Sequence, residues 1–146
     1  MTHAPIVLFV YNRPAFTRRT LEALAANHGA GESELFIFSD GPAAQATAAQ
    51  LAAITAVRQV IREQQWCRKV HIMESDNNKG LANSVISGVT QVIQQYGKVI
   101  VVEDDVVTSP FFLTFMNEAL EKYCGEERVL SIGSWNYYYH TDQQET

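Results

Sequence analysis

The sequence is short of positive charge, of long apolar runs and of cysteine, and each shortage excludes a class of protein. Of its 146 residues, 11 are Lys or Arg and 16 are Asp or Glu, giving a formal net charge of -5. The chain has no broad basic surface for a nucleic-acid backbone, so we expect no nucleic-acid partner. No apolar run reaches the roughly 20 residues that span a bilayer, and residues 1–5 lack the pattern of a signal peptide. We expect a soluble, cytoplasmic protein.

The two cysteines, Cys67 and Cys124, lie in unrelated segments and lack the spacing of zinc ligands. We expect both to be free thiols. Two phosphate-binding motifs are also missing, because no GxxxxGK[ST] loop occurs and no GxGxxG follows the first apolar run. These absences weaken the case for an NTPase or a dinucleotide-binding protein.

Apolar runs alternate regularly along the chain, and its 47% hydrophobic residues suffice for the core of one domain. Short β-branched and aromatic runs predict strands at 6–11, 35–39, 70–73 and 98–102, with one more at 129–132. Apolar residues at helical spacing predict helices at about 14–27, 43–65, 81–96 and from 110 onward. This alternation predicts a three-layer α/β/α fold with a mostly parallel central sheet.

Three of these elements also carry predictions about their apolar faces. Phe16 is predicted on the inner side of the first helix, and Phe115 and Tyr123 on the apolar face of the last one. The continuous apolar run at 98–102 is typical of a strand that is buried on both faces. His71, inside a strand, is predicted to be a structural side chain rather than a ligand.

Polar residues follow each of the first four predicted strands. Ligands of an open parallel sheet bind beyond the carboxyl ends of its strands, so this edge is where chemistry is expected. The residues concerned are Asn12 and Arg13, then Asp40 and Gly41, then 77–80, and finally Glu103, Asp104 and Asp105.

The acidic triplet at 103–105 has two interpretations. Carboxylates at the end of a buried strand repel one another unless a cation or hydrogen-bond donors compensate them. Magnesium or manganese, bound together with a phosphorylated ligand, is one such compensator. The other interpretation is an acidic turn that caps the following helix. The triplet alone leaves both open.

Four segments carry a resemblance to a known family, and they occur in the order IVLFVYNRP (6–14), FIFSDGP (36–42), NKGLANS (78–84) and VIVVEDDVVTSPFF (99–112). Together they resemble a GT-A type glycosyltransferase. The EDD with its preceding apolar strand and following phenylalanines is similar to the N-acetylglucosaminyltransferase I family. The first and third segments are similar to bacterial family 2 transferases. The SDG and NKG motifs are weak signals singly.

The resemblance implies a role for each polar residue at this edge. Asp105 is implied as the ligand of Mn²⁺ or Mg²⁺, with Glu103 and Asp104 near the ribose or the water shell of the metal. Asp40 is implied to face the uracil base. The remaining residues are implied to line the nucleotide pocket or to offset diphosphate charge: Tyr11, Asn12, Arg13 and Lys79.

The implied reaction is the transfer of a sugar from a UDP-sugar donor to a carbohydrate or other hydroxyl acceptor, with inversion. The general base is expected beyond the end of the chain. Residues 1–140 are predicted to be the donor-binding domain, and 141–146 a disordered tail. The aromatic residues at 135–139 are either the start of a sugar-facing wall or part of the core.

Two other functions compete with this one. The first is a non-catalytic module that binds a nucleotide or a protein. The second is a receiver-type signalling domain, but the acidic pair would then follow the first strand rather than the fourth. The identities of the sugar and acceptor and the oligomeric state do not follow from the sequence.

Overall fold

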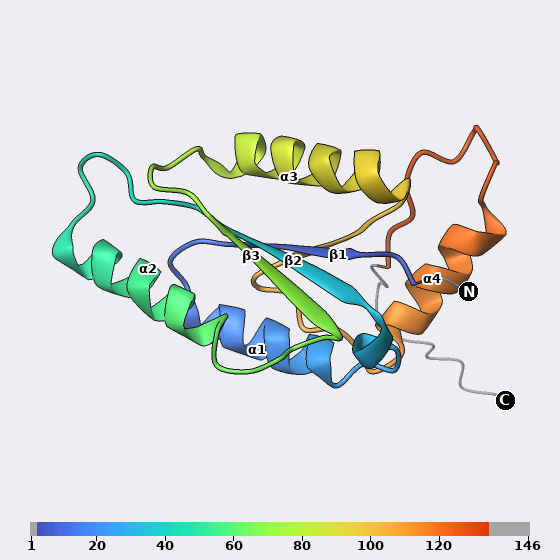
Figure 1. Ribbon diagram of the computed structural model, residues 1–146, viewed down its shortest axis with the longest axis horizontal. Helices are drawn as coiled ribbons and strands as arrows, with labels where there is room; N and C mark the ends of the chain where they lie inside the picture. Colours follow the sequence, from blue (N-terminus) through green and yellow to red (C-terminus); the bar gives the residue numbers. More distant parts are fainter. Residues whose placement is uncertain (1–2, 135–146) are drawn as a thin grey trace, which may run out of the picture.

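A parallel sheet of four strands lies at the centre of the structure, a computed structural model in which residues 3–134 are described (Figure 1). The strands are β1 (Ile6–Val10), β2 (Glu34–Ser39), β3 (Lys69–Glu74) and β4 (Ile100–Glu103). Their order in the sheet is β3-β2-β1-β4, and every neighbouring pair is parallel. The predicted α/β class with a parallel sheet is confirmed.

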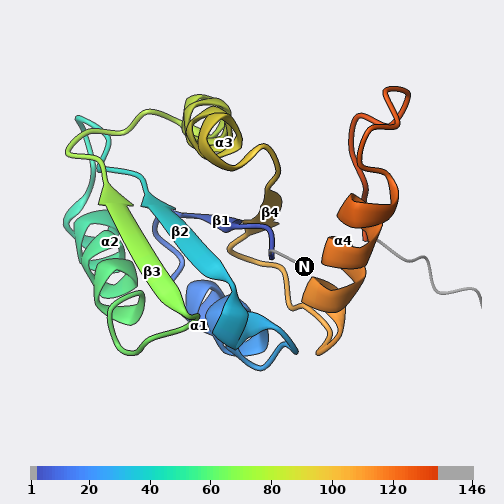
Figure 2. The same cartoon turned by 45° about the vertical axis from the view of Figure 1, so that its right-hand side comes forward.

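Helices cover both faces of this sheet. They are α1 (Pro14–Ala25), α2 (Ala48–Val60), α3 (Leu81–Tyr96) and α4 (Phe112–Lys122), with a short 3-10 helix, η1 (Ala30–Glu32). Figure 1 shows α1 and α2 on one face and α3 on the other. Figure 2 shows α4 to one side of the sheet, separate from α3. The predicted three layers are therefore present.

The alternation of side chains along β1 divides the core into two clusters. Ile6, Leu8 and Val10 belong to the cluster that packs with α1, α2 and α4. Val7 and Phe9 belong to the cluster that packs with α3. All five residues are buried, as expected for the central part of a parallel sheet with helices on both faces.

The ends of the helices follow local sequence signals. Pro14 occupies the first position of α1, where its missing N–H costs no hydrogen bond. Thr47 and Gln50 form a capping box that starts α2, so this helix is shorter than the predicted 43–65. Gly97 ends α3 with a φ of 74°, a conformation that glycine adopts without a steric penalty.

Several predictions about side chains and ends were wrong. Phe16 is 46% exposed, because it faces outward from the first turn of α1. Val101 of β4 is 44% exposed, so this strand is not buried on both faces. Phe115 and Tyr123 are exposed, and α4 instead buries Leu113, Met116 and Asn117.

The last part of the chain also differs from expectation. Residues 129–132 form no strand. The aromatic stretch at 135–139 and the predicted tail at 141–146 lie outside the described residues.

Two further expectations concern the cysteines and the membrane. Both cysteines are free thiols, and burial raises the pKa of Cys67 to about 12. Cys124 is exposed.

In the part of the chain that the structure describes, no helix has the length and apolar character needed to cross a bilayer.

The central strand yields a test of the fold. Leu8 is fully buried in β1, so Leu8→Ala leaves a cavity and is expected to lower the free energy of unfolding by about 2–5 kcal/mol. Leu130 is 95% exposed, so the same truncation there is expected to change it by no more than about 0.5 kcal/mol. Urea denaturation measures both. Equal losses in the two variants would contradict the placement of β1 in the core.

Candidate functional site

A pocket of about 330 Å³ lies at the carboxyl ends of the strands. It is bounded by the segment that follows β1, by the end of β2, by the start of α3 and by the turn after β4. Its lining residues are Phe9, Val10, Tyr11, Asn12, Arg13, Phe38, Asp40, Asn78, Gly80, Leu81, Ser84 and Asp104. Of the eight predicted site residues, this pocket brings together five: Tyr11, Asn12, Arg13, Asp40 and Asp104.

The position of the pocket follows from the order of the strands. The chain moves from β1 to β2 to β3 in one direction and then returns to the other side of β1 to form β4. The order therefore reverses at β1. In open α/β sheets this reversal separates the neighbouring loops and leaves a crevice at the carboxyl edge, where ligands bind.

Arg13 contacts both carboxylates of the acidic corner of the pocket, which consists of Asp104 and Asp105. One of its terminal nitrogens donates to Oδ1 of Asp104, and the other donates to Oδ2 of Asp105 at 3.3 Å. The side chain of Asp104 is 8% exposed, whereas those of Arg13 and Asp105 are nearly half exposed. The guanidinium also lies over the ring of Phe16, 5.4 Å from its centroid. Two carboxylates from the end of β4 thus converge on a single positive charge.

Burial sets the electrostatics of this corner. It raises the pKa of Asp104 above its ordinary value, and the hydrogen bond and charge of Arg13 offset this effect only in part. The hydrogen bond with Asp104 in turn raises the pKa of Arg13. A nearby cation therefore lowers the free energy needed to keep the buried carboxyl of Asp104 ionised.

The same two carboxylates are the candidate ligands of a divalent cation at this edge. Mg²⁺ is commonly bound by one or two protein carboxylates and completes its shell with water and phosphate oxygens. Asp104 and Asp105 both contact the guanidinium of Arg13, so they are the residues here that could hold such an ion. Within residues 3–134, no cluster of three or more His, Cys, Asp or Glu is arranged to hold a metal. A bound ion would thus need further ligands, such as those of a diphosphate.

Asp40 anchors the opposite wall of the pocket. Its Oδ1 accepts hydrogen bonds from the amides of Gly41 and Lys79, and its Oδ2 accepts one from the amide of Gly80, all at 2.8–3.0 Å. The side chain thereby ties the turn after β2 to the segment that precedes α3. The sequence predicted Asp40 as a site residue, but it did not predict the hydrogen bonds of Asp40 with the amides of Lys79 and Gly80.

Three predicted residues lie outside the pocket lining. Glu103 is the last residue of β4 and is exposed. Asp105 is exposed at the edge of the acidic corner. Lys79 is also exposed, and its amide rather than its ammonium group is what contributes to the wall.

Some lining residues were missed by sequence reasoning. Phe9 and Phe38 stack with their ring centroids 5.4 Å apart and form an apolar part of the wall. Leu81, the first residue of α3, is 64% exposed and also lines the pocket. A signal for the aromatic pair does exist: Gly88 of α3 lies so close that an added Cβ would be 2.9–3.1 Å from these rings. A glycine in an apolar helix face is typical of such close packing.

His71 has a structural environment, as predicted. Its ring stacks on Phe36 with centroids 4.3 Å apart, and its Nε2 lies 3.0 Å from Oε2 of Glu34. The residue lies outside the pocket at the carboxyl edge.

The comparison with protein families agrees with this geometry. The family described as Glycosyl transferase family 2 matches residues 6–144. The chain belongs to glycosyl transferase family 2. No curated protein matches the sequence.

Membership in family 2 establishes the general reaction, which is glycosyl transfer. It also confirms the GT-A resemblance, and the matched segment contains the whole of the carboxyl-edge pocket. The pocket is thus the candidate donor site of this family 2 domain.

The packing around Gly41 yields a prediction about the pocket wall. A Cβ at this position would lie 2.6–2.7 Å from backbone atoms of Ser75 and Asn77. Gly41→Ala is therefore expected to displace this segment and to lower the free energy of unfolding by about 1–3 kcal/mol. Gly31→Ala is the matched control, because an added Cβ there meets no atom within 4 Å. Chemical denaturation compares them, and an unaffected Gly41→Ala would contradict the close packing.

A second prediction concerns the acidic corner. Arg13→Gln leaves the buried Asp104 without its cation, so it is expected to destabilise the domain by roughly 1–3 kcal/mol in metal-free buffer at neutral pH. Arg18→Gln removes a guanidinium from α1, but its partner Glu63 is 41% exposed, and a much smaller loss is expected. Thermal and urea unfolding measure the difference. Equal losses would show that Asp104 does not need Arg13.

Proposed function

We propose that this family 2 domain binds a UDP-sugar in the carboxyl-edge pocket and transfers the sugar to a hydroxyl group of a carbohydrate or other acceptor. The observation that carries the proposal is the acidic corner, where Asp104 and Asp105 converge on one cation beside the pocket. A nucleotide in the pocket would bring its diphosphate to that corner.

Asp40 is proposed to recognise the base. Each carboxylate oxygen accepts up to about two hydrogen bonds. Oδ1 already accepts two, from Gly41 and Lys79, whereas Oδ2 accepts one, from Gly80, among the described residues. Oδ2 is therefore available to accept the ring N–H of uracil. Tyr11 and Asn12 would line the nucleotide, and the stacked pair of Phe9 and Phe38 supplies an apolar surface nearby.

Asp105 is proposed to hold Mn²⁺ or Mg²⁺, with Glu103 and Asp104 near the ribose or the water shell of the metal. The ion, when bound, stabilises the negative charge that develops on the departing diphosphate. Arg13 would then share Asp104 and Asp105 with the metal, and its half-exposed guanidinium is placed to meet phosphate oxygens. Lys79 is proposed to offset part of the diphosphate charge.

The proposal includes inversion at the anomeric carbon. Inversion requires a general base that removes the proton of the acceptor hydroxyl on the face opposite the leaving diphosphate. We assign no residue of 3–134 to that role. The residues of this domain instead bind and orient the donor.

Thermal unfolding with and without nucleotide and metal tests the proposal. A ligand at 100 times its Kd stabilises a protein by about 2.7 kcal/mol. UDP is expected to raise the Tm only with Mn²⁺ or Mg²⁺ present, and EDTA is expected to abolish the shift. Asp105→Asn is expected to remove the metal-dependent part, whereas Glu118→Gln, an exposed acidic residue on α4, leaves it unchanged. A full UDP shift in EDTA would overturn the metal assignment.

Turnover of the donor separates an enzyme from a binding module. Release of UDP from a UDP-sugar, in the presence of Mn²⁺ and a panel of acceptors, is the outcome expected for a transferase. UDP binding without any turnover would instead support the non-catalytic nucleotide-binding module.

A further inference from the structure

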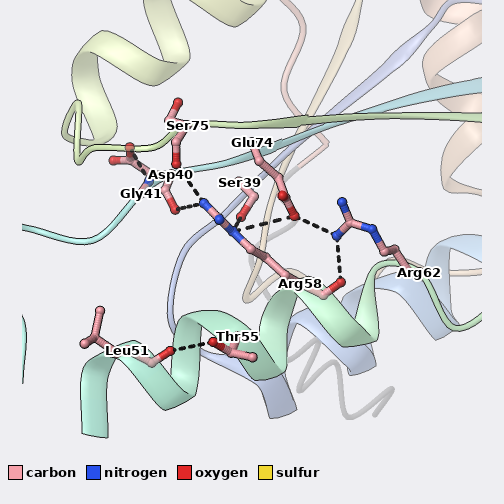
Figure 3. A network of polar contacts seen from close by, with 9 residues as sticks. All are labelled: Ser39, Asp40, Gly41, Leu51, Thr55, Arg58, Arg62, Glu74 and Ser75. Atoms are coloured by element: carbon pink, nitrogen blue, oxygen red, sulfur yellow. Dashed lines mark hydrogen bonds and ion pairs between the residues drawn. The ribbon is translucent and has the colours of Figure 1, made fainter. Parts of the chain in front are cut away.

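Arg58 of α2 connects the carboxyl ends of two strands without lining the pocket. Its Nε donates to Oγ of Ser39 at 3.3 Å. Its Nη2 donates to the carbonyl oxygen of Ser75 at 2.8 Å and to that of Asp40 at 3.4 Å. Figure 3 shows the guanidinium lying between these groups at the ends of β2 and β3.

The carboxylate of Glu74 lies close to this guanidinium. Oε1 of Glu74 lies 3.6 Å from Nε of Arg58 and 2.6 Å from Nη1 of Arg62. Arg62 also donates to the carbonyl oxygen of Arg58 at 2.9 Å (Figure 3). The two arginines thus share one carboxylate, but the hydrogen bonds to Asp40 and Ser75 come from Arg58.

The segment at 75–80 is held at both ends by this arrangement. Arg58 fixes its first residue through the carbonyl oxygen of Ser75. Asp40 fixes its last two residues through the amides of Lys79 and Gly80. Between them, the side-chain amide of Asn78 donates to the carbonyl oxygen of Gly41 at 3.1 Å. One guanidinium therefore contacts both the backbone of Asp40 and the first residue of the segment that Asp40 binds.

We propose that Arg58 is a positioning residue for the donor pocket. It acts through Asp40 and segment 75–80, which place Asn78, Gly80 and the start of α3 in the pocket wall. Arginine suits this role because its rigid fork of donors reaches several acceptors at once, whereas the ammonium group of lysine is a compact point charge on a flexible stem. The effect on the segment stands by itself, and the effect on nucleotide affinity rests on the proposed function.

Amide hydrogen exchange reports how often the hydrogen bonds of this segment open, and it requires no ligand. In Arg58→Met the amides of Lys79 and Gly80 are expected to exchange about tenfold faster than in the wild type, as measured by NMR. Arg62→Met is the matched control, because it removes a cation from the same carboxylate of Glu74 and leaves the hydrogen bonds to Ser75 and Asp40. Unchanged exchange in Arg58→Met, or equal acceleration in both variants, would overturn the proposal.

Arg58→Lys is a second, more conservative variant that tests the same proposal if Arg58→Met does not fold. It retains a positive charge near Glu74 but loses the fork that reaches Ser39, Asp40 and Ser75. We expect it to fold and to accelerate exchange at Lys79 and Gly80 less than Arg58→Met does. If Arg58→Lys protects these amides as well as the wild type does, positive charge alone suffices and the positioning role is rejected.

Binding of UDP in the presence of Mn²⁺, measured by calorimetry, tests the consequence for the pocket. Arg58→Met is expected to weaken binding about tenfold and to raise the KM for the donor, with kcat changed less; Arg62→Met is expected to stay within about twofold of the wild type. Faster exchange with unchanged UDP affinity would overturn the role of Arg58 in the donor site. A wild type that binds no UDP would instead overturn the proposed function, and the exchange result would stand.

Discussion

The parallel register of β1 with its two neighbours is the constraint on which the rest of the structure depends. Val10 pairs with Ser39 of β2, and Phe9 pairs with Glu103 of β4, so the chain leaves all three strands at one edge. β1 is buried along its whole length, which prevents it from shifting against its neighbours. Polar side chains that lie far apart in the sequence are therefore brought to a common edge by the packing of apolar ones.

That edge carries opposite electrostatic requirements on its two sides. At the end of β4, buried Asp104 needs a cation, which Arg13 supplies from the start of α1. At the end of β2, Asp40 accepts three backbone N–H groups rather than contacting a cation among the described residues, and its Oδ2 accepts only one of them. On the proposed function, a nucleotide diphosphate suits this division, with the N–H of its base at Asp40 and a divalent cation joining its phosphates to Asp104 and Asp105.

Rigidity of the pocket wall comes from contacts behind it rather than within it. Gly41 allows the backbone at Ser75 and Asn77 to approach closely, and Arg58 binds the same segment from the side of α2. A binding site held by such supporting contacts loses less conformational freedom when its ligand arrives. On the proposed function, these supporting residues contribute to donor affinity without touching the donor.

Much of the fold was predictable from the sequence, because periodicity and turn residues act locally. The four parallel strands, their intervening helices and the polar residues at the strand ends all follow from spacings within single segments. Some local signals were nevertheless misjudged. The helix predicted at 43–65 starts late because Thr47 and Gln50 form its cap, and Phe16 has helical spacing but faces outward from the first turn of α1.

The sequence by itself determined the order and type of the elements and the acidic and amide residues at their carboxyl ends. Only the tertiary structure decided that Arg13 pairs with Asp104, 91 residues away, that Asp40 binds the amides of Lys79 and Gly80, and that Arg58 reaches Ser75. The physical reason is that hydrogen bonds and ion pairs depend on the distance between atoms in space. Hydrophobic periodicity records which face of an element is apolar, but not which distant side chain the fold brings within reach of it.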